Sequence, residues 1–322
     1  MDRNKREEIK KQLAEEGFRL KEIREISKGR NSNVYKLQDA YGAQYLYKKY
    51  AKPNERDMRN RLETEKNFLD YCKIIGLSNV PTVEIYNKYD NWIIMSWLNG
   101  RHIDYLCDRD ISQIVNFISR LNNRRHKSYA KKIELASEAI VSHQSLVRDI
   151  LRKKMLLQKT KAGNKLRDEI KKWVEENLVP SIDNELSLFA KRIEDKAHWQ
   201  IHSHQLVVSP SDVGIHNTIR SDDNRLLFFD FEYAGKDDMS KQVCDWIEQP
   251  EYQFTLKQSG EFIESLIQLE LTHDSWIDRL KDIRVLVRLK WCLIMLRSYR
   301  EDQETLADFE KVKSYYNKTD RR

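Results

Sequence analysis

The chain has 322 residues, 34% of them charged, and a formal net charge of +7; this length suits about two domains of roughly 150 residues with a large core. It contains no run of about 18 apolar residues, and its first residues, MDRNKREEIKKQLAEEG, are charged throughout, so we expect neither a transmembrane helix nor a signal peptide. Four cysteines are scattered without a CxxC pair (Cys72, Cys107, Cys244 and Cys292), which argues against a disulfide framework and favours a reducing, cytoplasmic location.

The N-terminal part predicts a helix followed by strands. Residues 1–20 are polar, and we interpret them as a helix that serves as a lid or an edge extension. Beyond them, apolar residues alternate with polar ones at Ile23, Ile26, Val34 and Leu37, which predicts two strands around a turn.

The turn between these strands, residues 28–33, reads Lys-Gly-Arg-Asn-Ser-Asn. A turn of small polar residues lets backbone amides approach the phosphates of a nucleotide. An ordinary hairpin turn explains the same residues, and the single glycine makes no Walker A motif. The residues that would contact a nucleotide here are Gly29, Ser32 and Asn33.

Further strands and a helix follow in the first third of the chain. A second turn leads to a strand over residues 44–50, and residues 53–75 predict a helix. A short strand is predicted to begin at Val80-Pro81, and residues 91–97 predict an apolar strand that runs into the linker 98–100. The inner stripe of the helix comprises Leu62, Phe68, Leu69 and Cys72.

From Ile111 to about Lys196 the pattern predicts helices only. Residues 147–172 contain ten Lys or Arg against three Asp or Glu, and Gly163-Asn164 marks a break. We interpret residues 140–196 as a basic helical pair whose charges form a solvated face. An anionic substrate, RNA or an acidic membrane surface is the alternative partner, but nucleic acid is not favoured because stacking aromatic residues are missing.

The stretch between residues 206 and 235 carries the most chemistry. Apolar runs at 206–208 and 226–229 read as short buried strands, followed by SPSDVGIHN and by DFEYAG. They deliver Asp212, Asn217 and Asp230. Magnesium prefers oxygen ligands, which an amide and a carboxylate supply, and a second carboxylate can take a proton. Simple turn caps are the alternative.

These two loops resemble the signatures of the aminoglycoside phosphotransferase and choline/ethanolamine kinase superfamily. Glu232 and Tyr233, in DFEY, are typical of the choline-kinase side. The first loop departs from the family pattern His-Gly-Asp, since it reads Pro210-Ser211-Asp212 and lacks the supporting histidine.

The resemblance implies a two-lobed, protein-kinase-like α+β fold. A small antiparallel-sheet lobe would cover residues 1–98 and a mainly helical lobe residues 99–322. The implied reaction transfers the γ-phosphoryl group of ATP to a hydroxyl group. Asp212 would deprotonate the acceptor, and Asn217 and Asp230 would bind Mg²⁺.

The resemblance also assigns residues to the nucleotide. Lys48 would pair with the phosphates and Glu65 would hold it, although strand alternation leaves Lys49 open and Glu63 competes with Glu65. The backbone from Ser96 to Leu98 would bond adenine.

The acceptor is the least determined part of this hypothesis. Carboxylates and aromatic residues after the second loop favour an amine-bearing small molecule as the acceptor, such as an amino alcohol or an aminoglycoside. A sugar is the alternative acceptor. A protein or RNA acceptor and an inactive binding module are the rival readings. The candidate carboxylates are Glu232, Asp238 and Asp245.

Three other segments complete the reading. His198, His202 and His204 precede the first loop, and we favour structural or substrate-contact roles over a metal site for them. Residues 285–296 are apolar nearly all round and predict a buried helix. From Arg300 onward we expect the chain to fray.

Overall fold

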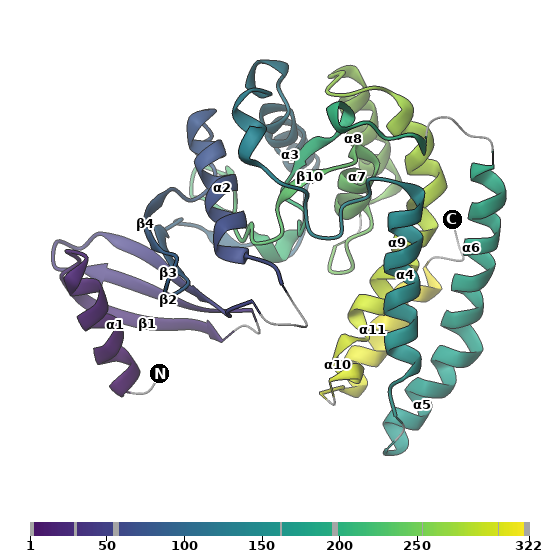
Figure 1. Ribbon diagram of the computed structural model, residues 1–322, viewed down its shortest axis with the longest axis horizontal. Coiled ribbons are helices and arrows are strands. Elements are labelled where there is room, and N and C mark those ends of the chain that lie inside the picture. Colours follow the sequence, from purple (N-terminus) through teal and green to yellow (C-terminus); the bar gives the residue numbers. More distant parts are fainter. Residues whose placement is uncertain are drawn as a thin grey trace.

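The computed structural model has two lobes, with the chain passing once from the smaller to the larger (Figure 1). No helix in the part of the chain that it describes is both long and apolar enough to cross a membrane. The described residues are 3–28, 31–53, 58–161, 163–194, 199–252, 254–301 and 303–318.

The small lobe is built on a five-stranded antiparallel sheet with the order β1-β2-β3-β5-β4. Alternation along β2 and β3 places Tyr35, Leu37 and Tyr47 in a compact core on one face of the sheet. The strands are β1 (Leu20–Lys28), β2 (Ser32–Asp39), β3 (Gln44–Tyr50), β4 (Val83–Asn87) and β5 (Trp92–Ser96).

Helix α1 (Arg3–Glu15) packs on the sheet and is not a lid or an edge extension. Its buried residues Ile9 and Leu13 join the core around Tyr47 and Trp92. Because α1 covers one face of the sheet, the opposite face is left for α2 and the large lobe.

Helix α2 (Arg61–Ile74) begins later than the sequence predicted. The side chain of Asn60 accepts a hydrogen bond from the Glu63 N–H and caps the first turn; residues 54–57 lie outside the described part. The strand predicted from Val80-Pro81 begins instead at Val83. A buried stripe on α2, including Phe68, faces the second loop of the large lobe, and the rings of Phe68 and Phe231 lie 4.5 Å apart.

The centre of the large lobe holds short strands that present the two loops. β7 (Val207–Ser209) pairs with β10 (Gly235–Asp237), and β8 (Thr218–Arg220) lies between β6 (Arg101–His102) and β9 (Leu226–Phe228). At the C-terminal end of α3 (Asp108–Leu121), the Asn122 side chain bonds the backbone N–H and C=O of Val208, at 2.7 and 3.0 Å.

The predicted basic helical pair consists of α4 (His143–Gln158) and a second helical run. That run is α5 (Lys165–Trp173), one π-helical stretch and α6 (Val179–Ile193), and Asn164 caps its start, at the predicted break. The expectation of helices only was wrong between α3 and α4, where two 3-10 turns and extended chain approach β10.

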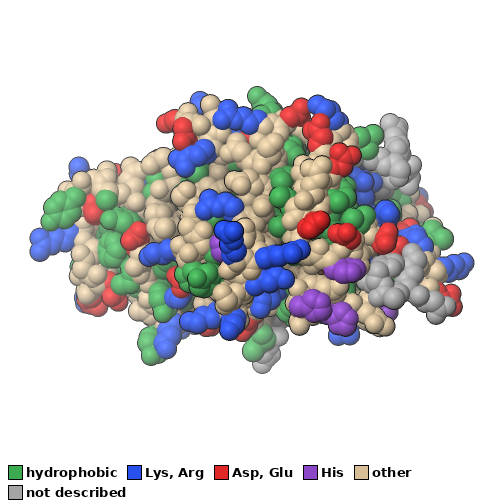
Figure 2. Space-filling model, turned by 90° about the horizontal axis from the view of Figure 1, so that it is seen from above, with side chains coloured by type: hydrophobic (Ala, Val, Ile, Leu, Met, Phe, Trp, Pro, Cys, Tyr) green, Lys and Arg blue, Asp and Glu red, His purple; other side chains and the backbone are tan. Residues whose placement is uncertain are grey.

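Much of the charge on this pair is neutralised within the fold. Lys154 bonds Asp183 on the facing helix, and Lys171 and Lys172 each lie within 4.0 Å of a glutamate one turn on. On the face seen from above, Lys and Arg gather across the middle and acidic side chains are interspersed toward the edges (Figure 2). These ion pairs agree with a largely solvated face.

The C-terminal helices close the large lobe. α9 (Ser275–Met295) contains the predicted buried helix and packs against α7 (Met239–Ile247), α6 and α4. The predicted fraying beyond Arg300 was wrong, because Phe309 and Tyr316 of α11 (Leu306–Asn317) bury their rings against Trp173. The remaining helices are α8 (Leu256–Gln268) and α10 (Arg297–Arg300).

Candidate active site

Lys48 on β3 lies at the centre of a cluster of carboxylates. Its Nζ is 2.8 Å from Glu65 Oε2 on α2, 2.5 Å from Asp230 Oδ1 and 3.1 Å from Glu232 Oε2. The structure therefore brings together the predicted lysine, glutamate and second-loop aspartate. The competing Lys49 points to the opposite face of the strand, and Glu63 is exposed at the start of α2.

Lys48 remains charged although it is buried. Burial alone would lower the pKa of the Lys48 amine, but Asp230 and Glu65 raise this pKa well above its usual range. Burial raises the pKa of the Glu65 carboxyl, an effect that Lys48 opposes. Because three carboxylates surround the Lys48 ammonium, the cluster is rich in acid and suited to a further cation.

Residues that the sequence analysis missed complete this cluster. The Tyr50 hydroxyl donates to Glu65 Oε2 at 2.6 Å, and Arg61 Nε lies 3.3 Å from Glu232 Oε1. The Asn31 amide donates to the same Glu232 oxygen at 2.9 Å, which ties the first turn to the second loop. Of these three residues, the sequence pointed only to Asn31, as part of the turn 28–33. It did not point to Tyr50 and Arg61, because their partners Glu65 and Glu232 lie far from them along the chain.

Asp212 lies in a loop whose backbone is constrained. Ser211 before it has a φ of 66° and Gly214 a φ of 154°. A Cβ atom on Gly214 would lie 2.8 Å from His216 Nδ1, so only glycine lets the loop turn this tightly. Strained residues of this kind are common where a loop must present a functional side chain.

His216 lies beside Asp212. Its Nε2 is 3.4 Å from Asp212 Oδ1, and its Nδ1 is 3.4 Å from Glu251 Oε2. Burial would lower the pKa of His216, but the two carboxylates raise it to about 10, so the imidazole is protonated at neutral pH. A histidine therefore lies beside Asp212 in the structure, four residues after it in the sequence.

Asn217 and Asp230 are neighbours because β8 and β9 pair. The Phe229 N–H donates to the Asn217 carbonyl at 3.1 Å, and the Asn217 amide donates to the Asp212 carbonyl at 2.8 Å. Asp230 has a φ of 67°, and its side chain is 40% exposed. A carboxylate that is open to the cleft and an amide oxygen beside it form a donor set that fits Mg²⁺.

One group of carboxylates in the described residues could hold a metal ion, and it is formed by Glu65, Asp230 and Glu232. His202 and His204 do not belong to it; their rings stack with centroids 5.5 Å apart, and His198 lies outside the described residues. His202 and His204 are exposed, and their structural or substrate-contact role stays a prediction.

The remaining nucleotide candidates have different surroundings. Ser32 and Asn33 begin β2 and pair with Tyr50 and Lys49, whereas Gly29 lies outside the described residues. Ser96 is fixed by two hydrogen bonds to Thr82, and the half-buried Leu98 follows it in the link between the lobes.

The acceptor candidates separate in the structure. Asp238 is fully buried, caps α7 and bonds Arg279 at 2.5 Å, so it does not fit contact with an acceptor. Glu232 belongs to the Lys48 cluster. Asp245 lines a cavity with Asp212, but it is held by Lys241 at 2.5 Å.

That cavity has a volume of about 640 Å³ and lies between the lobes. Asn31 lines it from the small lobe, and Asp212, Tyr233 and Trp291 are among the lining residues of the large lobe. A space of this size suits a small molecule. Beside β10, residues 135–136 pack so closely that a Cβ atom on Gly235 would lie 2.3 Å from the Ala136 backbone nitrogen.

Solved structures with this fold are kinases and phosphotransferases. A choline kinase from Streptococcus pneumoniae matches with a TM-score of 0.65 at 16% identity, over 99% of this chain and 98% of that chain. A spectinomycin phosphotransferase bound to ADP and spectinomycin matches at 0.65 and 12%, over 96% and 93%. A Plasmodium vivax ethanolamine kinase matches at 0.61 and 15%, over 92% and 82%.

No protein-family model matches the chain, and no curated protein matches its sequence. The structural matches confirm the two-lobed kinase-like fold that the two loops predicted.

Proposed function

We propose that this chain is an ATP-dependent phosphotransferase that acts on a hydroxyl group of a small molecule. The observation that carries this proposal is a chain of contacts: Lys48 bonds Glu65 and Asp230, and the Phe229 N–H next to Asp230 bonds the carbonyl of Asn217, whose amide bonds the Asp212 carbonyl. The fold is shared with kinases of choline and ethanolamine, which supports a small acceptor.

Magnesium-bound ATP would supply the transferable phosphoryl group and the metal charge that stabilises it. Lys48, oriented by Glu65, would contact the phosphates, and Asn217 and Asp230 would hold the metal. The turn with Ser32 and Asn33 would cover the phosphates, and the backbone at Ser96 and Leu98 would bond adenine.

Asp212 would receive the proton of the acceptor hydroxyl while the oxygen of that hydroxyl bonds to the γ-phosphorus and ADP leaves. His216, 3.4 Å from Asp212 Oδ1, would hold the Asp212 carboxylate in position. The alternatives of a protein or RNA acceptor are less well supported, since the cavity beside Asp212 is of small-molecule size.

The test is magnesium-dependent formation of ADP and of a phosphorylated product from a panel of hydroxyl compounds. Asp212→Asn should lower kcat by about 10²- to 10⁴-fold, the range for loss of a general base, and leave ATP binding intact. Asp222→Asn, an exposed aspartate in the turn between β8 and β9, is the matched control. Equal activity of wild type and Asp212→Asn would refute the assignment, and wild-type protein that does not bind ATP would support an inactive module.

A further inference from the structure

The wall of the 640 Å³ cavity is predominantly basic. Nine lysine and arginine side chains line it, against four aspartate and glutamate side chains. The basic residues are Lys52, Arg59, Arg61, Arg152, Lys153, Lys241, Lys290, Arg297 and Arg300, and the acidic residues are Glu138, Asp212, Asp245 and Glu301.

Three of the four wall carboxylates already contact a lysine or an arginine. Asp245 is held by Lys241 at 2.5 Å, and Glu301 by Arg297 at 2.9 Å. Glu138 bonds Lys153 at 2.5 Å and Lys290 at 2.9 Å. The fourth, Asp212, lies 3.4 Å from His216 Nε2.

Carboxylates behind the wall do not reverse this balance. Asp149 supports Lys153 and Lys290, Asp237 lies 3.5 Å from Lys241, and Glu232 pairs with Arg61. With these three included, nine cations still face seven carboxylates. The added carboxylates do not line the cavity, whereas the nine cations do.

One face of α9 combines this charge with apolar area. Val287, Trp291 and Ile294 recur at helical spacing and line the cavity, with Lys290 and Arg297 between and beyond them. Trp291 is half-buried and offers a flat surface. A ring or carbon chain can pack there while its charged substituents reach the neighbouring cations.

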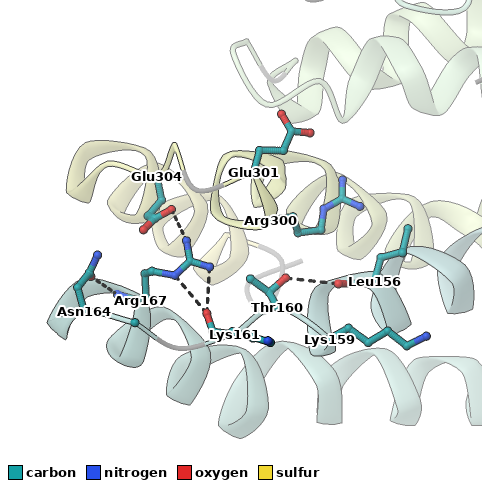
Figure 3. Close-up of a pocket in the computed structure, with 10 residues that line it drawn as sticks. Leu156, Lys159, Thr160, Lys161, Asn164, Arg167, Arg300, Glu301 and Glu304 are labelled. Carbon is teal, nitrogen blue, oxygen red and sulfur yellow. Dashed lines mark hydrogen bonds and ion pairs between the residues drawn. The ribbon is translucent and has the colours of Figure 1, made fainter. Parts of the chain in front are cut away.

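A second cavity of about 750 Å³ continues the basic surface toward the turn between α4 and α5. It shares Leu156, Arg300 and Glu301 with the first. Arg300 and Glu301 lie opposite the end of α4, which contributes Lys159 (Figure 3). The two cavities together give an acceptor room for more than one anionic group.

We propose that the acceptor is an anionic hydroxyl compound, a sugar or polyol that carries a phosphate or carboxylate group. This inference rests on the proposed phosphotransferase function. An anionic acceptor must approach the negatively charged phosphates of ATP, and a cationic wall offsets that repulsion. The carboxylates that suggested an amine in the sequence are paired with Lys48, Arg61, Arg279 and Lys241, so the basis for an amine acceptor is removed.

The salt bridge between Arg297 and Glu301 provides a sharp test. Both side chains are half-exposed and lie one turn apart, so Arg297→Gln and Glu301→Gln break the same pair at a similar cost in stability. The two substitutions change the cavity charge in opposite directions. Arg297→Lys, which keeps the charge, is the matched control.

Binding of inorganic phosphate is measured by calorimetry on protein saturated with magnesium and a non-hydrolysable ATP analogue. We expect Arg297→Gln to weaken phosphate binding about tenfold, and Glu301→Gln to strengthen it several-fold. Arg297→Lys should stay near wild type, and added salt should weaken binding. Undetectable binding in wild type, or equal changes in both Gln variants, would overturn the inference.

Turnover is then compared across glucose, glucose 6-phosphate, glucuronate and glucosamine, and across glycerol, glycerol 3-phosphate and ethanolamine. Preference for the anionic members supports the inference, and preference for glucosamine, ethanolamine or the neutral members overturns it while leaving the phosphotransferase function intact. Failure to bind the ATP analogue instead contradicts the proposed function itself.

Discussion

Two neighbouring charged regions of the site have opposite balances of charge. In the Lys48 cluster, the cations Lys48 and Arg61 contact three carboxylates. The cavity wall around Asp212, which shares Arg61 with that cluster, has nine cations and four carboxylates. Carboxylates therefore outnumber cations in the first region, and cations outnumber carboxylates in the second.

This difference indicates which ligand each region fits. A surplus of carboxylates with one of them exposed suits a metal ion, which would replace part of the role that Lys48 now plays for Asp230. A surplus of cations suits an anion. The same cleft can therefore hold a metal-bound nucleotide on one side and an acceptor of negative charge on the other.

The largest expected effect comes from Asp230. Asp230→Asn removes the exposed carboxylate and should lower magnesium-dependent turnover by roughly 10³-fold, since a bound metal contributes several kcal/mol of charge stabilisation. Asparagine tolerates the φ of 67° at this position, so the loop should keep its backbone conformation. Steady-state kinetics over a magnesium titration measure the change, and turnover near the wild-type level would show that Asp230 is no ligand.

Lys48 tests the same region through stability. Lys48→Met leaves the Glu65 carboxylate buried without its cation, and we expect it to lower the free energy of unfolding by about 3 kcal/mol. Adding Glu65→Leu should recover part of this loss, because a buried pair of apolar residues avoids an uncompensated charge. Urea unfolding of wild type, both single variants and the double variant gives the coupling energy, and additive losses would contradict a buried ion pair.

The sequence was sufficient for the parts of this molecule that depend on local patterns. Alternation predicted the small-lobe strands, and Gly163-Asn164 predicted the break at which Asn164 caps α5. The two loops predicted that Asp212, Asn217 and Asp230 would meet, because each follows a short buried strand and β8 pairs with β9.

Other features depend on contacts between distant residues and were not predictable. The sequence predicted that α11 would fray, because its few apolar residues pack against Trp173, which lies far earlier in the chain. The charge of the cavity wall is set by residues of α4, α9 and α10 together, so a count of carboxylates along one segment does not give it. The amine-bearing acceptor that those carboxylates suggested stays a prediction. His216 was seen only as part of a turn, since its partner Glu251 lies beyond α7.

A substitution of His216 tests whether this residue positions Asp212, one of the residues that line the cavity. His216→Ala should lower kcat about tenfold, because a small displacement of Asp212 from the acceptor hydroxyl is costly. The KM for ATP should stay unchanged if the residue positions Asp212 only. His216→Gln can still donate to Asp212 and should recover part of kcat, whereas equal loss in both variants would indicate a role that depends on the imidazole itself.

The smallest expected effect concerns Glu138, the carboxylate that contacts Lys153 and Lys290 in the cavity wall. Burial would raise the pKa of Glu138, but Lys290 and Lys153 outweigh it and hold this pKa well below its usual value of 4.5. The folded pKa is thus depressed, so the stabilisation is present above about pH 4.5 and is lost as the pH falls below it. Glu138→Gln should lower the free energy of unfolding by about 1 kcal/mol at pH 7, the size of one lost charge-assisted hydrogen bond.

This difference between Glu138→Gln and wild type should shrink as the pH falls below 4.5, because Glu138 then takes up a proton in the unfolded chain while it stays ionised in the folded protein. Thermal unfolding between pH 7 and 3 measures the convergence, and Glu134→Gln serves as the control because Glu134 is exposed in the same segment. A stability difference that stays constant over this range would mean that the Glu138 carboxylate does not hold Lys153 and Lys290 in place. Asp149 would then be the carboxylate that holds Lys153 and Lys290 at the cavity wall.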